Sequence, residues 1–408
     1  MSSCRKPNEI EIDGSKGEGG GQILRNSISY ATILRKPIRI TKIRSNRSKP
    51  GLKAQHVASL QLPTRICGVV LKGDAIDSQI IQYEPGKPRI TTSQLEQINL
   101  TSNIETAGSI CLLIQAALPC ALMGSAVPIS LTLRGGTNAT MAPQYDYWER
   151  VFWPTLRDLF QLQPNQVEAT VVRRGYFPKG GGLVRIRVLP ICEALPPISM
   201  TERGQVVEIS IRAFHAGKLP IHLAKQMASA AQHFLQPRFP NTPVYTEVVT
   251  EKEAVGSGLG IIIVATTNTG CRLAGSALME RQQKAFDVGV RAATELWSTI
   301  QDGGCVDEWL QDQLILFMAL ARGESKILTG SLTLHTQSAI EIAKVVACAE
   351  FEVTRILDEG DDIVAKTVTN CRYGEAGRIP GKHIIRCRGI GFSSYCTPEE
   401  ITQSDMKV

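Results

Sequence analysis

Several features that would indicate other classes of protein are missing from this 408-residue chain. Its 11 cysteines form no C-x-x-C pair, and histidines and cysteines never cluster at the spacing of zinc ligands. An odd number of cysteines cannot all pair within one chain. The sequence therefore predicts free thiols in a reducing compartment and no zinc site.

Apolar segments of the kind that enter membranes are missing too. The first residues carry no apolar run typical of a secretory signal. The longest apolar stretch, residues 109–124, is interrupted by Gln115 and Pro119 and is too short to span a bilayer. With 43% hydrophobic and 20% charged residues, the chain can bury a substantial core. We expect a soluble protein without a membrane partner, built as two domains or as one large domain with an insertion.

Acidic residues are absent from the whole segment between Gly19 and Gly73. The same segment holds eleven lysines and arginines, which exceeds the net charge of +7 of the entire chain, so the remainder is net acidic. These positive residues are Arg25, Arg35, Lys36, Arg39, Lys42, Arg44, Arg47, Lys49, Lys53, Arg65 and Lys72. The asymmetry favours a polyanionic partner, such as phosphates or nucleic acid, over a basic face that only meets solvent.

What the chain does contain is an alternation of strand-like and helix-like patterns, which predicts an α/β fold. Strands are expected over residues 37–43, 127–133, 166–173, 182–189, 205–213, 244–250, 260–267 and 326–334. Helices are expected over residues 54–70, 105–122, 145–160, 221–234, 282–299, 306–322 and 338–350. Pro190, Pro196 and Pro197 exclude continuous regular structure over residues 189–199. The small β-α-β-β unit that follows this segment is therefore expected to be an inserted domain.

A glycine-rich loop over residues 13–25 is expected to open a helix. Glycines let backbone N–H groups approach a phosphate, although the loop lacks the Gly-Lys-Ser/Thr ending of a Walker A sequence. Glu18 inside this loop would repel phosphates unless a divalent cation lay between them, so it is a candidate metal ligand. The alternative is a tight turn with Glu18 facing solvent.

Two further groups of polar residues suit phosphate and nucleotide chemistry. Arg44 and Arg47 supply forked guanidinium groups for phosphates, and nearby His56 could be a base, a phosphate donor or a structural residue. Trp309, Asp312 and Gln313 stand at i, i+3 and i+4, so they share one helix face that could stack on a base and bind a ribose or an amine.

His335 is expected at the end of the strand over residues 326–334, where α/β folds often place catalytic groups. A lone histidine can equally be structural, so this pattern alone leaves both roles open.

Five motifs taken together resemble those of the RNA 3′-terminal phosphate cyclase family, in order and over residues 11–391. They are residues 17–25, residues 134–138 with 141–143, residues 174–182, residues 311–314 and residues 334–337. The resemblance implies an α/β fold with a large catalytic domain of three repeated units, each of two helices on a four-stranded sheet, and a smaller inserted α/β domain. We expect the large domain at 1–196 and 302–408 and the insertion at 197–301.

The resemblance also implies a reaction, in which ATP converts an RNA 3′-phosphate to a 2′,3′-cyclic phosphodiester and releases AMP and pyrophosphate. The intermediates it implies are a covalent histidyl-AMP on His335 and an RNA(3′)pp(5′)A species. The ATP-binding positions it implies are Gln115, Pro143, Trp309, Asp312, Gln313 and His335. The positions for phosphate or RNA are Gln22, Arg25, Arg44, Arg47, Gln55 and His56. Glu18 matches an acid linked to Mg²⁺ or another divalent cation, and Trp309 replaces the usual tyrosine.

Two alternatives remain beside the cyclase. One is a non-cyclase paralogue that acts in ribosomal RNA processing, which the presence of His335, Asp312 and Gln313 argues against. The other is an RNA-binding module without catalysis, in which the basic segment grips the RNA backbone. A nuclear location in the nucleoplasm is implied by the resemblance, with the cytoplasm as the alternative and secretion excluded.

Overall fold

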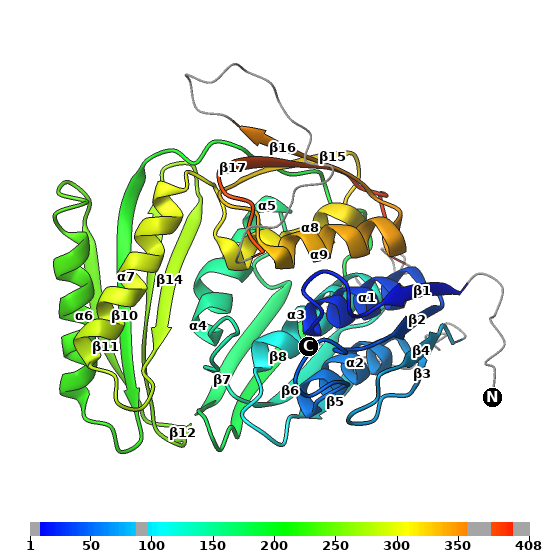
Figure 1. Ribbon diagram of the computed structural model, residues 1–408, viewed down its shortest axis with the longest axis horizontal. Coiled ribbons are helices and arrows are strands. Elements are labelled where there is room, and N and C mark those ends of the chain that lie inside the picture. The colour runs from blue at the N-terminus through cyan, green and yellow to red at the C-terminus, as the bar shows by residue number, and fades with distance from the viewer. Residues whose placement is uncertain (1–8, 87–96, 357–376, 395–408) are drawn as a thin grey trace.

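The computed structural model describes residues 9–86, 97–356 and 377–394. It is a mixed α/β structure with four sheets, which confirms the predicted fold class (Figure 1). In the described part of the chain, no helix is both long and apolar enough to cross a membrane. Cys111, Cys120, Cys271, Cys305, Cys348 and Cys387 are free thiols.

Three units repeat the order strand, helix, strand, helix, strand, strand. The first contains β1 (Ile10–Asp13), α1 (Gly21–Leu34), β2 (Ile38–Thr41), α2 (Ala54–Cys67), β3 (Val70–Lys72) and β4 (Ile81–Glu84). The second contains β5 (Ile98–Asn103), α3 (Ile110–Met123), β6 (Ile129–Gly135), the helical run α4 (Tyr145–Tyr147), η1 (Trp148–Phe152) and α5 (Trp153–Leu159), then β7 (Val167–Gly175) and β8 (Gly182–Val188). The third contains β9 (Ser199–Met200), α8 (Glu308–Leu320), β15 (Glu324–Thr329), α9 (Leu334–Ile342) with η2 (Ala343–Ala347), β16 (Glu350–Ile356) and β17 (Lys382–Arg388).

Each unit begins with a parallel strand pair, β1 with β2, β5 with β6 and β9 with β15. One continuous apolar cluster joins the helices of all three units, and α1 is buried along nearly its whole length. Sequence segments as apolar as residues 110–123 have no polar face to leave in water, so their helices pack on several sides. The helices therefore lie between the sheets (Figure 1).

The fourth sheet belongs to the inserted segment, which forms the left side of Figure 1. The inserted segment contains β10 (Val206–Ala216), α6 (Ile221–Leu235), β11 (Val244–Glu251), β13 (Gly258–Thr267), β14 (Arg272–Leu278) and α7 (Ala285–Gln301). The strand order in its sheet is β11-β10-β13-β14. Alternate residues of β13 pack against α6 and α7 or against the main core, which explains why residues 260–267 read as an uninterrupted apolar strand.

Two short strands tie the insertion to the repeated units. β9 falls inside the range expected for the insertion, yet it pairs with β15 as the first strand of the third unit. β12 (Ala254–Val255) leaves the insertion and pairs with β7 at Arg174 and Gly175. The exact domain boundaries of 196/197 and 301/302 stay a prediction.

Two local predictions were wrong in ways that matter for the site. The helix expected from residue 105 begins at Ile110, because residues 104–109 form a loop whose Ser109 N–H is bound by the Gln55 side chain. The strand expected to reach residue 334 ends at Thr329, and His335 lies in the first turn of α9. Thr333 caps that turn by accepting a hydrogen bond from the N–H of Thr336 at 3.1 Å, so a helix starts where a strand was expected.

Candidate active site

The glycine-rich loop ends in a capped helix start. Oε1 of Glu18 accepts hydrogen bonds from the N–H groups of Gln22 at 2.8 Å and Ile23 at 3.3 Å. Those N–H groups would otherwise have no partner in the first turn of α1, and a carboxylate is favourable at the positive end of the helix dipole. Arg47 donates to the carbonyl of Glu18 at 2.8 Å and lies 3.7 Å from Oε2.

The first turn of α9 carries His335 and is fixed by α8. Oε1 of Gln311 accepts from the hydroxyl of Thr336 at 2.8 Å and from the N–H of Thr333 at 3.4 Å. Gln311 is almost fully buried, and its Nε2 donates to the carbonyl of Ser331 at 3.4 Å. It therefore positions the turn that bears His335. Sequence reasoning assigned Gln311 no role, although it lies inside one of the family motifs.

The glycine-rich loop also contacts α9 directly. The N–H of Glu18 donates to Oγ of Ser338 at 2.9 Å, and Ser338 donates in turn to the carbonyl of Leu334 at 2.8 Å. A Cβ on Gly17 would lie 2.4 Å from the same Oγ, and Gly17 has a positive φ of 57°. The close approach therefore requires glycine, and it brings Glu18 into the neighbourhood of His335.

The charges around His335 favour its neutral form. Partial desolvation lowers the pKa of His335, and Arg25 and Arg47 lower it further against an opposing effect of Glu18. The His335 side chain is exposed to solvent, so it can be reached by a substrate. A neutral imidazole beside arginines is suited to nucleophilic attack on a phosphate.

His56 and Arg25 converge at the start of α1. A Cβ on Gly21 would lie 2.7 Å from Nη1 of Arg25 and 3.0 Å from Nε2 of His56. Burial, Arg44 and Arg25 lower the pKa of His56 to about 3, so its ring is neutral. Its Nδ1 accepts from the N–H of Lys53 at 3.0 Å, which places the proton on Nε2. Nε2–H is therefore a donor directed toward the helix start, and this geometry supports the phosphate-donor role among the three left open.

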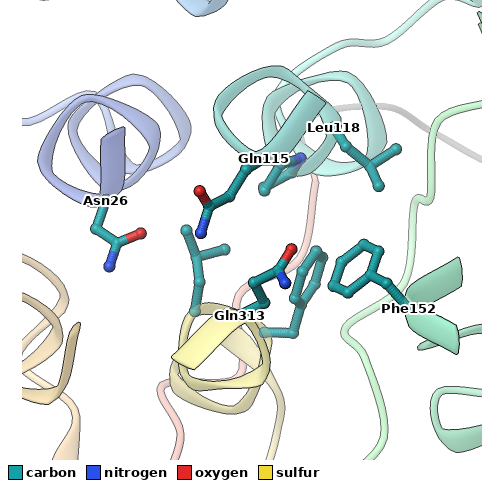
Figure 2. Close-up of a pocket in the computed structure, with 8 residues that line it drawn as sticks. Asn26, Gln115, Leu118, Phe152 and Gln313 are labelled. Atoms are coloured by element: carbon teal, nitrogen blue, oxygen red, sulfur yellow. The ribbon is translucent and has the colours of Figure 1, made fainter. Parts of the chain in front are cut away.

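Arg25 links α1 to the predicted nucleotide-binding residues. Its Nε donates to Oε1 of Gln115 at 2.7 Å. Arg25 also lies close enough to Asp312 for its positive charge to oppose the rise in the pKa of that carboxyl that burial causes. Gln115, Gln313 and Asn26 line a cavity of about 10 Å³ between α1, α3 and α8, which Figure 2 shows. That volume holds about one water molecule, so the cavity itself is not a nucleotide site.

Asp312 is buried and poorly satisfied. Burial raises its pKa to about 7, although neighbouring Gln22 and Arg25 act in the opposite direction. Its Oδ1 has no hydrogen-bond partner among the described residues. Buried polar atoms are rarely left without a partner, so this oxygen is a candidate acceptor for a ligand.

Trp309 lies in a different cavity from Gln313, although both belong to α8. This cavity has a volume of about 360 Å³, and Ser331, Arg378 and Glu295 also line it. Burial raises the pKa of Glu295 to about 7, and hydrogen bonds from Ser276 and Trp309 only partly oppose this rise. The volume is within the range of small-molecule sites. Trp309 and Gln313 were expected to share one binding face with Asp312, but they line two different cavities.

The remaining predicted residues lie around this centre. Oε1 of Gln55 accepts from the N–H of Ser109 at 2.7 Å and so caps α3. Nε of Arg44 is buried without a hydrogen-bond partner in the described ranges, and burial together with Arg47 lowers its pKa. Pro143 is half-buried in the loop after β6. Glu18, Arg25, Arg44, Arg47 and His56 thus form one neighbourhood with His335, while Pro143 and Trp309 have no described contact with it.

Comparison with known proteins agrees with the motifs. A family model described as RNA 3′-terminal phosphate cyclase matches residues 16–353. The chain is similar to a protein from Staphylothermus marinus named RNA 3′-terminal phosphate cyclase, with 36% identity over 94% of this chain and 99% of the relative. A protein of the same name from Drosophila melanogaster is 34% identical over 94% of this chain and 97% of the relative. A third, from Thermococcus onnurineus, is 37% identical over 84% of this chain and 95% of the relative.

Proposed function

Because the chain belongs to the RNA 3′-terminal phosphate cyclase family, we propose that it converts an RNA 3′-phosphate to a 2′,3′-cyclic phosphodiester at the expense of ATP. The observation that carries the proposal is the gathering of Glu18, Arg25 and Arg47 around an exposed, neutral His335. Neither a paralogue without the nucleophile nor a simple RNA-binding module would need that arrangement.

The first step forms histidyl-AMP. The unprotonated nitrogen of His335 attacks the α-phosphorus of ATP, a P–N bond forms, and the P–O bond to pyrophosphate breaks. Arg25 and Arg47 offset the charge that develops on the transferred and leaving phosphates. The unpartnered Oδ1 of Asp312 would accept a hydrogen bond from the nucleotide, and the cavity beside Trp309 has the size and the aromatic wall to hold an adenine.

The next two steps occur on the RNA. An oxygen of the RNA 3′-phosphate attacks the phosphorus of histidyl-AMP, which releases His335 and forms RNA(3′)pp(5′)A. The adjacent 2′-hydroxyl then attacks the RNA phosphorus, AMP leaves, and the cyclic phosphodiester closes. The second attack is intramolecular, so a fixed ribose supplies much of the rate. The Nε2–H of His56 and the Arg25 guanidinium would hold the 3′-phosphate during both steps.

A divalent cation such as Mg²⁺ would need more ligands than the described residues offer. Within the described residues, no three His, Cys, Asp or Glu side chains form a metal-binding group. Oε1 of Glu18 caps α1, so Glu18 could offer the cation only its Oε2 atom. The ATP phosphates and water would provide the remaining ligands of the cation. Bound there, the ion would offset negative charge on the pyrophosphate. A location in the nucleoplasm stays a prediction.

Labelling with ATP carrying ³²P at the α-phosphate tests the proposal. The wild-type protein should acquire label that is stable to base and labile to acid, and should transfer it to an RNA 3′-phosphate with formation of a cyclic end. His335→Ala should acquire no label, whereas His383→Ala, which alters a buried histidine of β17 opposite Thr329 of β15, should be labelled if it folds. Equal labelling of His335→Ala and wild type would defeat the assignment.

A further inference from the structure

The motif at residues 174–182 is not used by the site described above, yet it borders an open sheet face. In β6 and β8, the residues facing the helices are buried, including Leu131, Leu133, Val184 and Ile186. The opposite face carries arginines from three neighbouring strands. They are Arg134 on β6, Arg173 on β7, and Arg185 and Arg187 on β8.

None of these arginines forms an ion pair within the described residues. In the parts of the chain that the structure describes, Arg134 and Arg185 make no ion pair, and neither does Lys179 at the end of the same hairpin. Glu168 lies opposite Arg187 in the strand register, Glu105 lies in the loop before α3, and Glu149, Glu251 and Glu253 line a cavity with Arg173 at the edge of the sheet. The face therefore has an excess of positive charge and suits a polyanion.

An aromatic ring projects from the hairpin that ends this face. Phe177 is 80% exposed, although its backbone is firmly held. The N–H of Gly180 donates to the carbonyl of Tyr176 at 2.8 Å, and Nε of Arg173 donates to the carbonyl of Gly181 at 3.1 Å. The insertion adds a further bond, from the N–H of Tyr176 to the carbonyl of Val255 at 3.1 Å. A rigidly mounted ring among cations is a typical stacking platform for unpaired bases.

This hairpin is connected to the proposed active site by close backbone contacts. Gln55, the neighbour of His56, binds the N–H of Ser109 at the start of α3. The loop before that helix reaches the hairpin, since a Cβ on Gly180 would lie 2.6 Å from the carbonyl oxygen of Thr106. A strand of RNA whose 3′ end lies at His56 could therefore continue past this loop to Phe177.

We propose that the nucleotides preceding the 3′ end bind at an upstream surface made of Phe177, Lys179 and Arg134. A base stacks on the ring of Phe177, and Lys179 and Arg134 bind backbone phosphates. The occupant is single-stranded RNA, because the unpaired cations call for a polyanion and the exposed ring calls for an unstacked base. The inference rests on the proposed function, which places the 3′-phosphate at His56 and Arg25. The proposal also assigns a function to the insertion, because β12 supports the hairpin that carries Phe177.

Substrate length provides the test. A dinucleotide with a 3′-phosphate can occupy the active site without reaching Phe177, whereas a dodecanucleotide with the same end can reach it. Phe177→Leu keeps an apolar side chain but removes the ring, and it should lower kcat/KM for the dodecanucleotide about fivefold or more while leaving the dinucleotide unchanged. Phe286→Leu, which alters a ring that is 55% exposed on α7 of the insertion, should affect neither.

Salt dependence tests the phosphate contact separately. Lys179→Gln should reduce the slope of log K against log salt by about 0.7 for the dodecanucleotide, as expected for one lost phosphate contact. Lys225→Gln, on the exposed side of α6, is the matched charge control. Equal effects on both substrates, or no effect on either, would overturn the upstream surface. Failure of the wild type to cyclise either substrate would instead count against the proposed function.

Discussion

The N–H of Glu18 and the hydroxyl of Ser338 form a hydrogen bond of 2.9 Å between positions 320 residues apart. It joins the glycine-rich loop of the first repeated unit to the helix of the third unit that carries His335. The bond holds Glu18 in the neighbourhood of His335, whose pKa the Glu18 charge raises against the effects of desolvation and two arginines.

Loss of this hydroxyl should impair both stability and chemistry. Ser338→Ala leaves the Glu18 N–H without its partner, which should lower the free energy of unfolding by about 1–3 kcal/mol. It should also slow adenylylation of His335, because the loop is no longer held against α9. Ser59→Ala is a suitable control, since Ser59 is equally buried in a helix but donates only within it, to Gln55 at 2.8 Å. Similar adenylylation rates for the two variants would show that the contact is dispensable.

Gly21→Ala should separate activity from stability. The added methyl would meet the ends of two side chains, Nη1 of Arg25 and Nε2 of His56, which can move aside at little cost to folding. Displacement of these groups by about 1 Å should reduce the cyclisation rate about 100-fold. Thermal unfolding and steady-state cyclisation are the two measurements. A fully active Gly21→Ala protein would mean that Arg25 and His56 do not need their positions.

Asp312 should make stability depend on pH. Because its folded pKa is raised to about 7, the folded chain holds a proton between about pH 4 and pH 7 that the unfolded chain releases. This contribution to stability is complete below the unfolded pKa and is lost as the pH rises through the folded pKa. The asparagine of Asp312→Asn does not titrate, so the variant lacks this pH dependence. The wild type should therefore become less stable relative to the variant by a few kcal/mol as the pH rises to about 8. Urea unfolding without nucleotide measures this, and a pH-independent difference would contradict it.

Asp146 should be essential for docking the insertion. It is fully buried and lies 3.0 Å from two nitrogens of Arg174 and 3.0 Å from Nη1 of Arg212 on β10. Asp146→Asn would leave two buried guanidinium groups with Glu251 as their shared counter-charge, so the free energy of unfolding should fall by about 3–5 kcal/mol. Asp158→Asn breaks an exposed pair with Arg272 and should cost less than about 1 kcal/mol. Equal costs in denaturant unfolding would refute the role of the network.

The sequence by itself determined the α/β class and most of the elements, and its resemblance to a family supplied most of the candidate site residues. Local patterns suffice for the elements, because strand and helix periodicities and glycine turns act over a few residues. Residues 145–160 were predicted as one helical run and form one, and the run at 260–267 was predicted as a strand and lies in β13. The acid-free segment indicated a phosphate partner from charge alone.

Tertiary structure decided how those residues act, because burial and charge depend on neighbours that are distant in the sequence. Gln311 could not be recognised as the support of His335 until α8 and α9 were packed together. His56 is held neutral by desolvation and by Arg25, which is contributed by a different helix. Trp309 and Gln313 share a helix, but the space around α8 divides them between two cavities. Spacing along a chain identifies which groups are present, whereas the packed fold sets their protonation, their partners and their access to substrate.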